Sequence, residues 1–121
     1  MVLHAIARMT IPFKKVNEAI EILSSVSQRA RVESGCISCY VYRDVDSANS
    51  LMIEGIWQDE KDLARHLRSD DYQKILLVAE MASAPPEINF YKILRTSGVE
   101  TVEKARSARG KMHGNGEEVL E

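Results

Sequence analysis

Apolar residues occupy every second position at the start of the chain. They are Leu3, Ala5, Ala7, Met9 and Ile11. An alternation with a period of two is typical of a strand that buries one face. Pro12 ends the pattern, because proline has no N–H to donate to a neighbouring strand. The sequence therefore predicts a first strand over residues 2–11.

The hydrophobic spacing then changes from two to three and four. Apolar side chains recur at Phe13, Val16, Ala19, Ile20, Leu23, Val26 and Ala30. This spacing predicts a long amphipathic helix over residues 13–32. Gly35 follows it, and glycine often closes a helix because it tolerates a left-handed backbone.

Three further strands and two helices are indicated by the rest of the pattern. The runs 36–43 and 51–57 are strand-like and are separated by polar turn formers, which predicts an antiparallel hairpin. Asp59 is a suitable cap for a helix that runs to about residue 68. Ser69 is a suitable cap for a second helix, which Pro85 and Pro86 end. Residues 88–96 again resemble a strand.

The order β-α-β-β-α-α-β is typical of an α+β, ferredoxin-like fold. We expect one four-stranded antiparallel sheet with its helices on one face, formed by residues 1–96. The other face needs a cover, so we predict a homodimer. For the extension, residues 97–121, we expect a helix over 99–109 that docks on the partner, and disorder after it.

Length, composition and charge narrow the class of protein. A chain of 121 residues fits one domain, and a formal net charge of −2 argues against nucleic acid as a partner. No apolar run is long enough for a membrane helix, and residues 1–8 do not resemble an export signal, so we expect a cytoplasmic protein.

Two cysteines, Cys36 and Cys39, have the spacing of some metal and redox sites. In a regular strand, however, residues three apart point to opposite faces. We therefore expect two thiols and no metal site. The chain also lacks a glycine-rich phosphate loop, so we expect no nucleotide cofactor.

Three short segments carry a resemblance to a known family. They are Glu33-Ser34-Gly35-Cys36 before the second strand, Glu54-Gly55-Ile56-Trp57 at the end of the third, and Trp57-Gln58-Asp59-Glu60 followed by Leu63 and His66. In their order and spacing, over residues 1–96, they resemble the antibiotic biosynthesis monooxygenase domain of the dimeric α+β barrel group.

The resemblance implies a dimer whose two sheets face each other, with a pocket in each subunit between sheet and helices. The group includes enzymes that oxidise quinols and polycyclic phenols with dioxygen and no cofactor, and others that degrade haem or isomerise small molecules. The haem-degrading members use an Asn, a Trp and a His at positions that fall at or near Ala7, His66 and Leu76. We therefore expect no haem and no other cofactor.

Three side chains are candidates for the site. His66 lies at the edge of an apolar helix face, and an imidazole can take a proton from a phenol or enol. Trp57 is a candidate wall for a flat substrate and a donor through its indole N–H. Tyr72 is a candidate for holding a substrate oxygen. A packing role is the alternative for each of the three.

The sequence thus favours a cofactor-independent monooxygenase that oxidises a small aromatic or quinol-like substrate with dioxygen. His66 would be catalytic, and Trp57 and Tyr72 would bind the substrate. Two alternatives stay open. One is a dimer of the same fold that binds or senses a small molecule without catalysis, and the other is a small-molecule isomerase.

Overall fold

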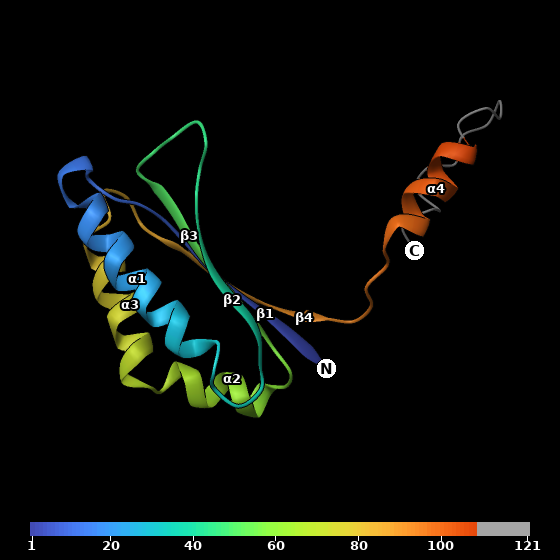
Figure 1. Cartoon of the computed structure of the whole chain (residues 1–121), viewed down its shortest axis with the longest axis horizontal. Helices are drawn as coiled ribbons and strands as arrows, with labels where there is room; N and C mark the ends of the chain where they lie inside the picture. Colours follow the sequence, from blue (N-terminus) through green and yellow to red (C-terminus); the bar gives the residue numbers. More distant parts are fainter. Residues whose placement is uncertain (109–121) are drawn as a thin grey trace.

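Four strands form one antiparallel sheet, which Figure 1 shows beside a layer of helices. The computed structural model describes residues 1–108. The strands are β1 (Val2–Thr10), β2 (Cys36–Arg43), β3 (Ser50–Trp57) and β4 (Glu87–Ile93), in the spatial order β2-β3-β1-β4. This arrangement confirms the predicted α+β, ferredoxin-like fold.

The helices follow the predicted order with small differences at their ends. They are α1 (Val16–Ala30), α2 (Glu60–Leu67), α3 (Asp70–Glu80) and α4 (Val99–Ala108). A single 3-10 turn, Phe13–Lys15, precedes α1, so the long predicted helix begins with a tighter turn. The last strand ends at Ile93, three residues earlier than the pattern indicated.

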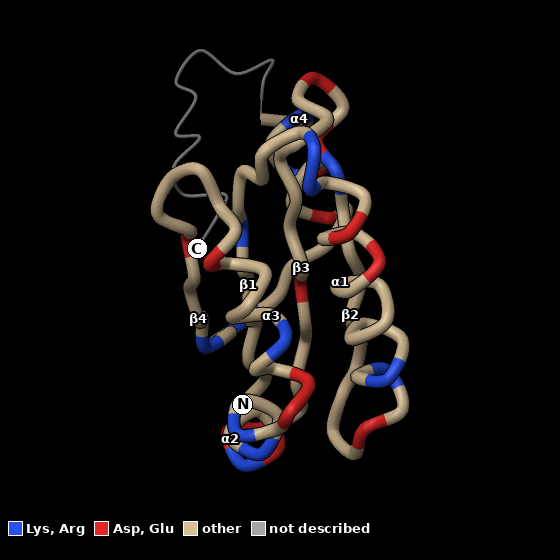
Figure 2. The backbone as a smooth tube through the Cα atoms, turned by 90° about the vertical axis from the view of Figure 1, so that its left-hand side faces the viewer, with Lys and Arg blue, Asp and Glu red and all other residues tan. Residues whose placement is uncertain are grey.

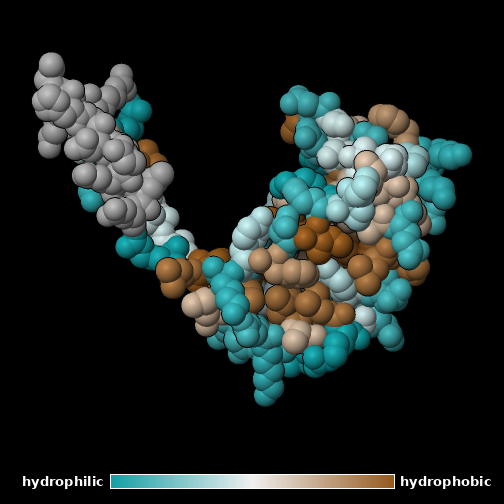
Figure 3. Space-filling view, turned by 180° about the vertical axis from the view of Figure 1, so that it is seen from behind, coloured by the Kyte–Doolittle hydropathy of each residue, from teal (hydrophilic) through white to brown (hydrophobic). Residues whose placement is uncertain are grey.

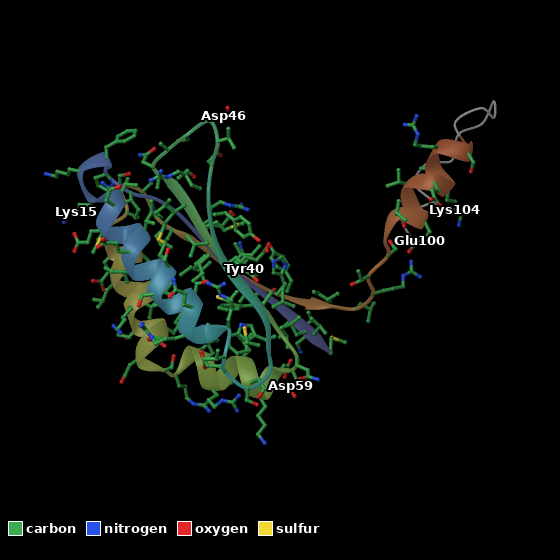
Figure 4. The ribbon with its side chains drawn as sticks, viewed as in Figure 1. Lys15, Tyr40, Asp46, Asp59, Glu100 and Lys104 are labelled. Atoms are coloured by element: carbon green, nitrogen blue, oxygen red, sulfur yellow. The ribbon has the colours of Figure 1, made fainter. Side chains whose placement is uncertain are left out.

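Side-chain caps fix where α2 and α3 begin. The carboxylate of Asp59 accepts a hydrogen bond from the N–H of Asp62 at 2.9 Å, and the hydroxyl of Ser69 accepts one from the N–H of Tyr72 at 3.2 Å. Each cap satisfies a backbone donor that the first helical turn leaves free. Figure 4 labels Asp59 where the chain leaves β3 and enters α2. Two short helices therefore follow β3 closely.

The core lies between the sheet and α1, α2 and α3. Along β3 every second residue is buried, and these residues are Leu51, Ile53, Gly55 and Trp57. Leu23 and Val26 of α1 and Val78 of α3 are fully buried opposite them. Apolar burial of this kind is the main favourable term in folding. The predicted spacing of buried apolar residues, two in the strands and three to four in the helices, is thus confirmed.

The face of the sheet away from the helices carries aromatic side chains. Tyr40, Tyr42 and Tyr91 are about half exposed, and the guanidinium of Arg31 lies 4.7 Å from the Tyr40 ring centroid. No helix of residues 1–108 covers this face of the sheet, which Figure 1 shows open toward the side opposite α1 and α3.

A bulge in β2 overturns the prediction for the two cysteines. Cys36 lies opposite Trp57 and Ser38 opposite Ile56, so Ile37 is an extra residue in the ladder. Because of this extra residue, Cys36 before the bulge and Cys39 after it lie opposite Trp57 and Gly55, which are on the same face of β3. Cys36 and Cys39 therefore both face the helices, and the prediction of opposite faces was wrong. Both are free thiols, and residues 1–108 contain no cluster of three metal-ligating side chains.

The final described helix stands apart from the rest of the fold. Figure 1 shows α4 beyond the end of β4, and Figure 4 shows Glu100 and Lys104 on it, far from the sheet. A helix over 99–109 was predicted, and α4 covers Val99–Ala108. The predicted disorder falls on residues 109–121, which lie outside the described part of the chain.

Charged residues of both signs are interspersed along the described backbone, as Figure 2 shows. In the described part of the chain, none of the helices combines the length and apolar character needed to cross a membrane. Figure 3 shows hydrophobic side chains gathered near the centre of the face seen from behind, with polar residues around them.

Replacement of Gly35 by alanine is expected to destabilise the protein. Gly35 has φ +83°, and a Cβ there would lie 2.1 Å from Oδ2 of Asp62. The left-handed backbone alone costs an alanine about 1–2 kcal/mol, and Asp62 must move in addition. Urea unfolding should show a loss of at least that size. Ser34→Ala, at the exposed neighbouring position, is the control and should change the free energy of unfolding by less than about 0.5 kcal/mol.

Candidate functional site

A small cavity lies between the sheet and the helices α2 and α3. Its volume is about 20 Å³. It is lined by Ala5, Ile6, Ala7, Cys39, Ile53, Gly55, Trp57, His66, Tyr72 and Ile75. All three site residues predicted from the sequence are therefore brought to one cavity. Most of the other lining residues are apolar, as in small-molecule sites generally.

His66 is the centre of this group. Its side chain is buried, with only 4% of the residue exposed, although histidine is usually only partly buried. The imidazole stacks on the ring of Trp57 with a centroid distance of 4.5 Å, and Tyr72 meets it edge-on at 5.6 Å. The arrangement fixes the plane of the imidazole on two sides.

A carboxylate completes the surroundings of His66. Nδ1 of His66 lies 2.9 Å from Oε2 of Glu33, which is on the turn between α1 and β2. Sequence reasoning placed Glu33 in a family segment but did not include it in the site. The two residues are 33 positions apart, and only the packing of that turn on α2 brings them together.

Three polar atoms of the cavity residues have no hydrogen-bond partner within residues 1–108. They are Nε2 of His66, Nε1 of Trp57 and the hydroxyl oxygen of Tyr72. Yet no fully buried side-chain nitrogen or oxygen of the described chain lacks a partner. These three atoms must therefore reach accessible space. Two donors and one group that can accept a proton are available to a molecule bound there.

Gly55 leaves the space that the indole of Trp57 occupies. An added Cβ at Gly55 would lie 2.8 Å from Nε1 of Trp57, which is shorter than the distances that Cβ atoms keep from non-bonded atoms in proteins. Gly55 and Trp57 are on the same face of β3, two residues apart. A glycine in a strand interior often marks such a close approach. Here it allows the indole N–H to lie beside the cavity.

Burial determines which group of the cavity can act as a base. It raises the pKa of the Tyr72 hydroxyl above its ordinary value, and it raises the pKa of the Cys39 thiol to about 11. Both groups therefore keep their protons at neutral pH. Among the residues that line the cavity, His66 is left as the side chain that can accept a proton.

The size of the cavity limits what it holds in this conformation. About 20 Å³ is enough for one water-sized molecule, whereas an apolar cavity known to hold benzene has a volume of roughly 150 Å³. An aromatic ring therefore enters only when the surrounding side chains move.

Comparison with known proteins assigns the chain to a family. The family model described as "Antibiotic biosynthesis monooxygenase" matches residues 2–76, which is more than half of the chain. The chain belongs to this family. The matched segment contains Glu33, Trp57, His66 and Tyr72. Among curated proteins, none matches the chain.

Solved structures from several organisms share the fold of this chain. A conserved protein from Methanosarcina mazei is 29% identical, with 76% of this chain and 92% of that one covered and a TM-score of 0.70. Rv0793 from Mycobacterium tuberculosis is 20% identical, with 81% and 100% covered and a TM-score of 0.72. A candidate antibiotic biosynthesis monooxygenase from Deinococcus radiodurans is 18% identical, with 81% and 97% covered and a TM-score of 0.72.

The family assignment supports monooxygenase activity at the level of the family. Its members are typically dimeric. The last two structures are below 25% identity to this chain and show the shared fold. The catalytic and binding roles of His66, Trp57 and Tyr72 stay predictions, and the geometry adds that the three side chains line one cavity.

The two thiols are expected to differ in reactivity. Cys39 is buried, and with a pKa of about 11 only about one molecule in a thousand carries its thiolate at pH 8. Cys36 is partly exposed, and burial together with the nearby Glu33 raises its pKa. Iodoacetamide at pH 8, followed by peptide mass spectrometry, should label Cys36 first.

The control is the same labelling in urea, where both thiols should react at similar rates. Labelling of Cys39 in the folded protein as fast as in urea would mean that the cavity wall is open to reagent.

Proposed function

We propose that this chain is a monooxygenase that oxidises a small aromatic, phenol or quinol-like substrate with dioxygen and without a bound cofactor. The observation that carries the proposal is the buried imidazole of His66, whose Nε2 has no hydrogen-bond partner within residues 1–108 and reaches accessible space at the cavity. The family assignment supports the same reaction class.

The reaction balances without a cofactor. A phenol with a free para C–H and one O₂ give a quinone and one water, and a quinol in the same way gives a hydroxyquinone and water. One oxygen atom enters the ring, and the other accepts the two hydrogens as water. The substrate supplies all the electrons once it has lost its hydroxyl proton.

His66 would begin the reaction as general base. Nε2 takes the hydroxyl proton, and the resulting phenolate gives one electron to O₂. The phenoxyl radical and superoxide then join in a C–O bond, and the peroxide takes the proton back from the imidazolium. Loss of the ring C–H proton to His66 next breaks the O–O bond, and the departing hydroxide takes that proton and leaves as water.

Trp57 and Tyr72, which pack against His66, would assist the reaction. The indole face, 4.5 Å from the imidazole, attracts the ring in its protonated state through a cation–π interaction. Burial keeps Tyr72 protonated, so its hydroxyl can donate to the developing phenolate oxygen. His66 covers one face of Trp57, and only 1% of the residue is exposed, so we assign substrate contact to the indole N–H.

The small cavity implies that substrate binding and exclusion of water occur together. Because about 20 Å³ holds one small molecule, the ring of the substrate displaces side chains when it enters and leaves little room for water. A phenolate in such a site is poorly solvated, which favours electron transfer to O₂.

The open face of the sheet is proposed to bind a second copy of the chain. Tyr40, Tyr42 and Tyr91 are about half exposed there, and exposed aromatic side chains gathered on one face often mark an interface. Members of the family are typically dimeric, which supports a two-fold dimer for this chain as well.

Oxygen uptake with 1-naphthol and a panel of other phenols and quinols tests the proposal. The purified protein, freed of metals with a chelator, should consume O₂ saturably. His66→Gln should lower kcat by about 100-fold or more, the usual effect of losing a general base. Lys61→Gln, an exposed substitution in the same helix, is the matched control and should leave kcat unchanged.

The outcomes separate the three readings of the site. Product formed equally well under nitrogen would indicate an isomerase and contradict the proposal. Ligand-induced stabilisation without O₂ uptake or product would indicate a binding protein of the same fold. Full activity in His66→Gln would remove His66 from the mechanism.

A further inference from the structure

We infer that Glu33 is a positioning residue for His66: its carboxylate holds the imidazole in the tautomer that keeps Nε2 unprotonated toward the cavity, and it balances the charge of the imidazolium. The catalytic part of this inference rests on the proposed function. The tautomer does not, because it follows from the geometry of the free protein.

The first step is the direction of the hydrogen bond. Oε2 of Glu33 lies 2.9 Å from Nδ1 of His66, and an ionised carboxylate only accepts hydrogen bonds. Nδ1 must therefore carry the proton of the neutral imidazole. The proton is then absent from Nε2, which has no partner within residues 1–108 and becomes the basic atom.

The second step is the fixed position of Glu33. The N–H of Glu33 donates to the carbonyl of Ala30 at 3.0 Å, at the end of α1. The carbonyl of Gly35 accepts from the N–H of Gln58 at 2.8 Å, and the carbonyl of Ser34 accepts from Nη2 of Arg65 at 2.8 Å. The turn that carries Glu33 is thus bonded to Gln58, just before α2, and to α2 itself, which carries His66.

Arg65 strengthens the same connection. Its Nη2 also lies 2.7 Å from Oδ1 of Asp62, one turn earlier on α2, and this contact within the helix holds the guanidinium where it reaches the carbonyl of Ser34. Arg65 directly precedes His66 in the chain. The distance between Glu33 and His66 is therefore set by hydrogen bonds on both sides rather than by two free side chains.

The third step is the difference in exposure. The side chain of Glu33 is 25% exposed and that of His66 is 5% exposed. The carboxylate is thus partly hydrated, while the imidazole that it contacts is screened from water. When Nε2 takes a proton, the positive charge forms in a buried place with a negative partner already in contact. Without that partner the imidazolium would be buried and unpaired.

Nitrogen NMR of the histidine side chains tests the tautomer. The ¹⁵N shifts of Nδ1 and Nε2 distinguish the protonated from the unprotonated nitrogen, and His66 is assigned by the signals lost in His66→Gln. At pH 8 the full-length protein should show protonated Nδ1 and unprotonated Nε2. Glu33→Ala should shift His66 toward the Nε2–H tautomer, which a free imidazole side chain prefers in water.

Kinetics with the best substrate of the panel tests the catalytic consequence. Glu33→Gln should lower kcat by about 10- to 100-fold while KM changes by less than about threefold, the usual size of an effect through an orienting partner. Glu33→Gln keeps the shape of the side chain and so guards against a folding defect. Glu18→Ala, an exposed glutamate on α1, is the matched control and should leave both the NMR signals and kcat unchanged.

Each outcome supports or overturns the inference. Unprotonated Nδ1 in the unmodified protein, or the same tautomer after Glu33→Ala, overturns it. A tautomer shift together with undiminished kcat removes the catalytic part. A tautomer shift in a protein that oxidises no substrate supports the positioning role and refutes the oxygenase proposal separately.

Discussion

Burial of the His66 imidazole is the constraint on which the site depends. A polar ring that loses contact with water costs free energy unless its nitrogen atoms find partners. In this fold one nitrogen is bonded to Glu33 and the other reaches the cavity, while the ring faces are in contact with Trp57 and Tyr72. The same arrangement that makes the burial tolerable leaves one basic atom available.

The local structure around β3 serves this arrangement. Gly55 gives the indole of Trp57 the room that a side chain would occupy, and the caps at Asp59 and Ser69 start two helices close behind the strand. His66 and Tyr72 therefore come from the consecutive helices α2 and α3, and their rings are in contact. Chemistry and packing are not separate here, because each site residue also belongs to the core or its margin.

Much of the fold was predictable because its elements have regular periods. Alternation along β1 and β3 and the spacing in α1 identify buried faces directly, and the caps mark the starts of α2 and α3. His66, Trp57 and Tyr72 could be predicted as candidates from residue type and from the family segments. Two features could not. The extra residue Ile37 changes the face of Cys36 and breaks no sequence pattern, and Glu33 reaches His66 only through tertiary contacts of its turn.

Isotope labelling tests the central claim most directly. The protein is supplied with 1-naphthol, or the best substrate of the panel, under ¹⁸O₂ in ordinary water. The product is reduced at once to the hydroquinone, because quinone oxygens exchange with water. A monooxygenase predicts one ¹⁸O atom in each product molecule and the other in water. Product without label, or with oxygen taken from labelled water in the reverse experiment, would contradict the account.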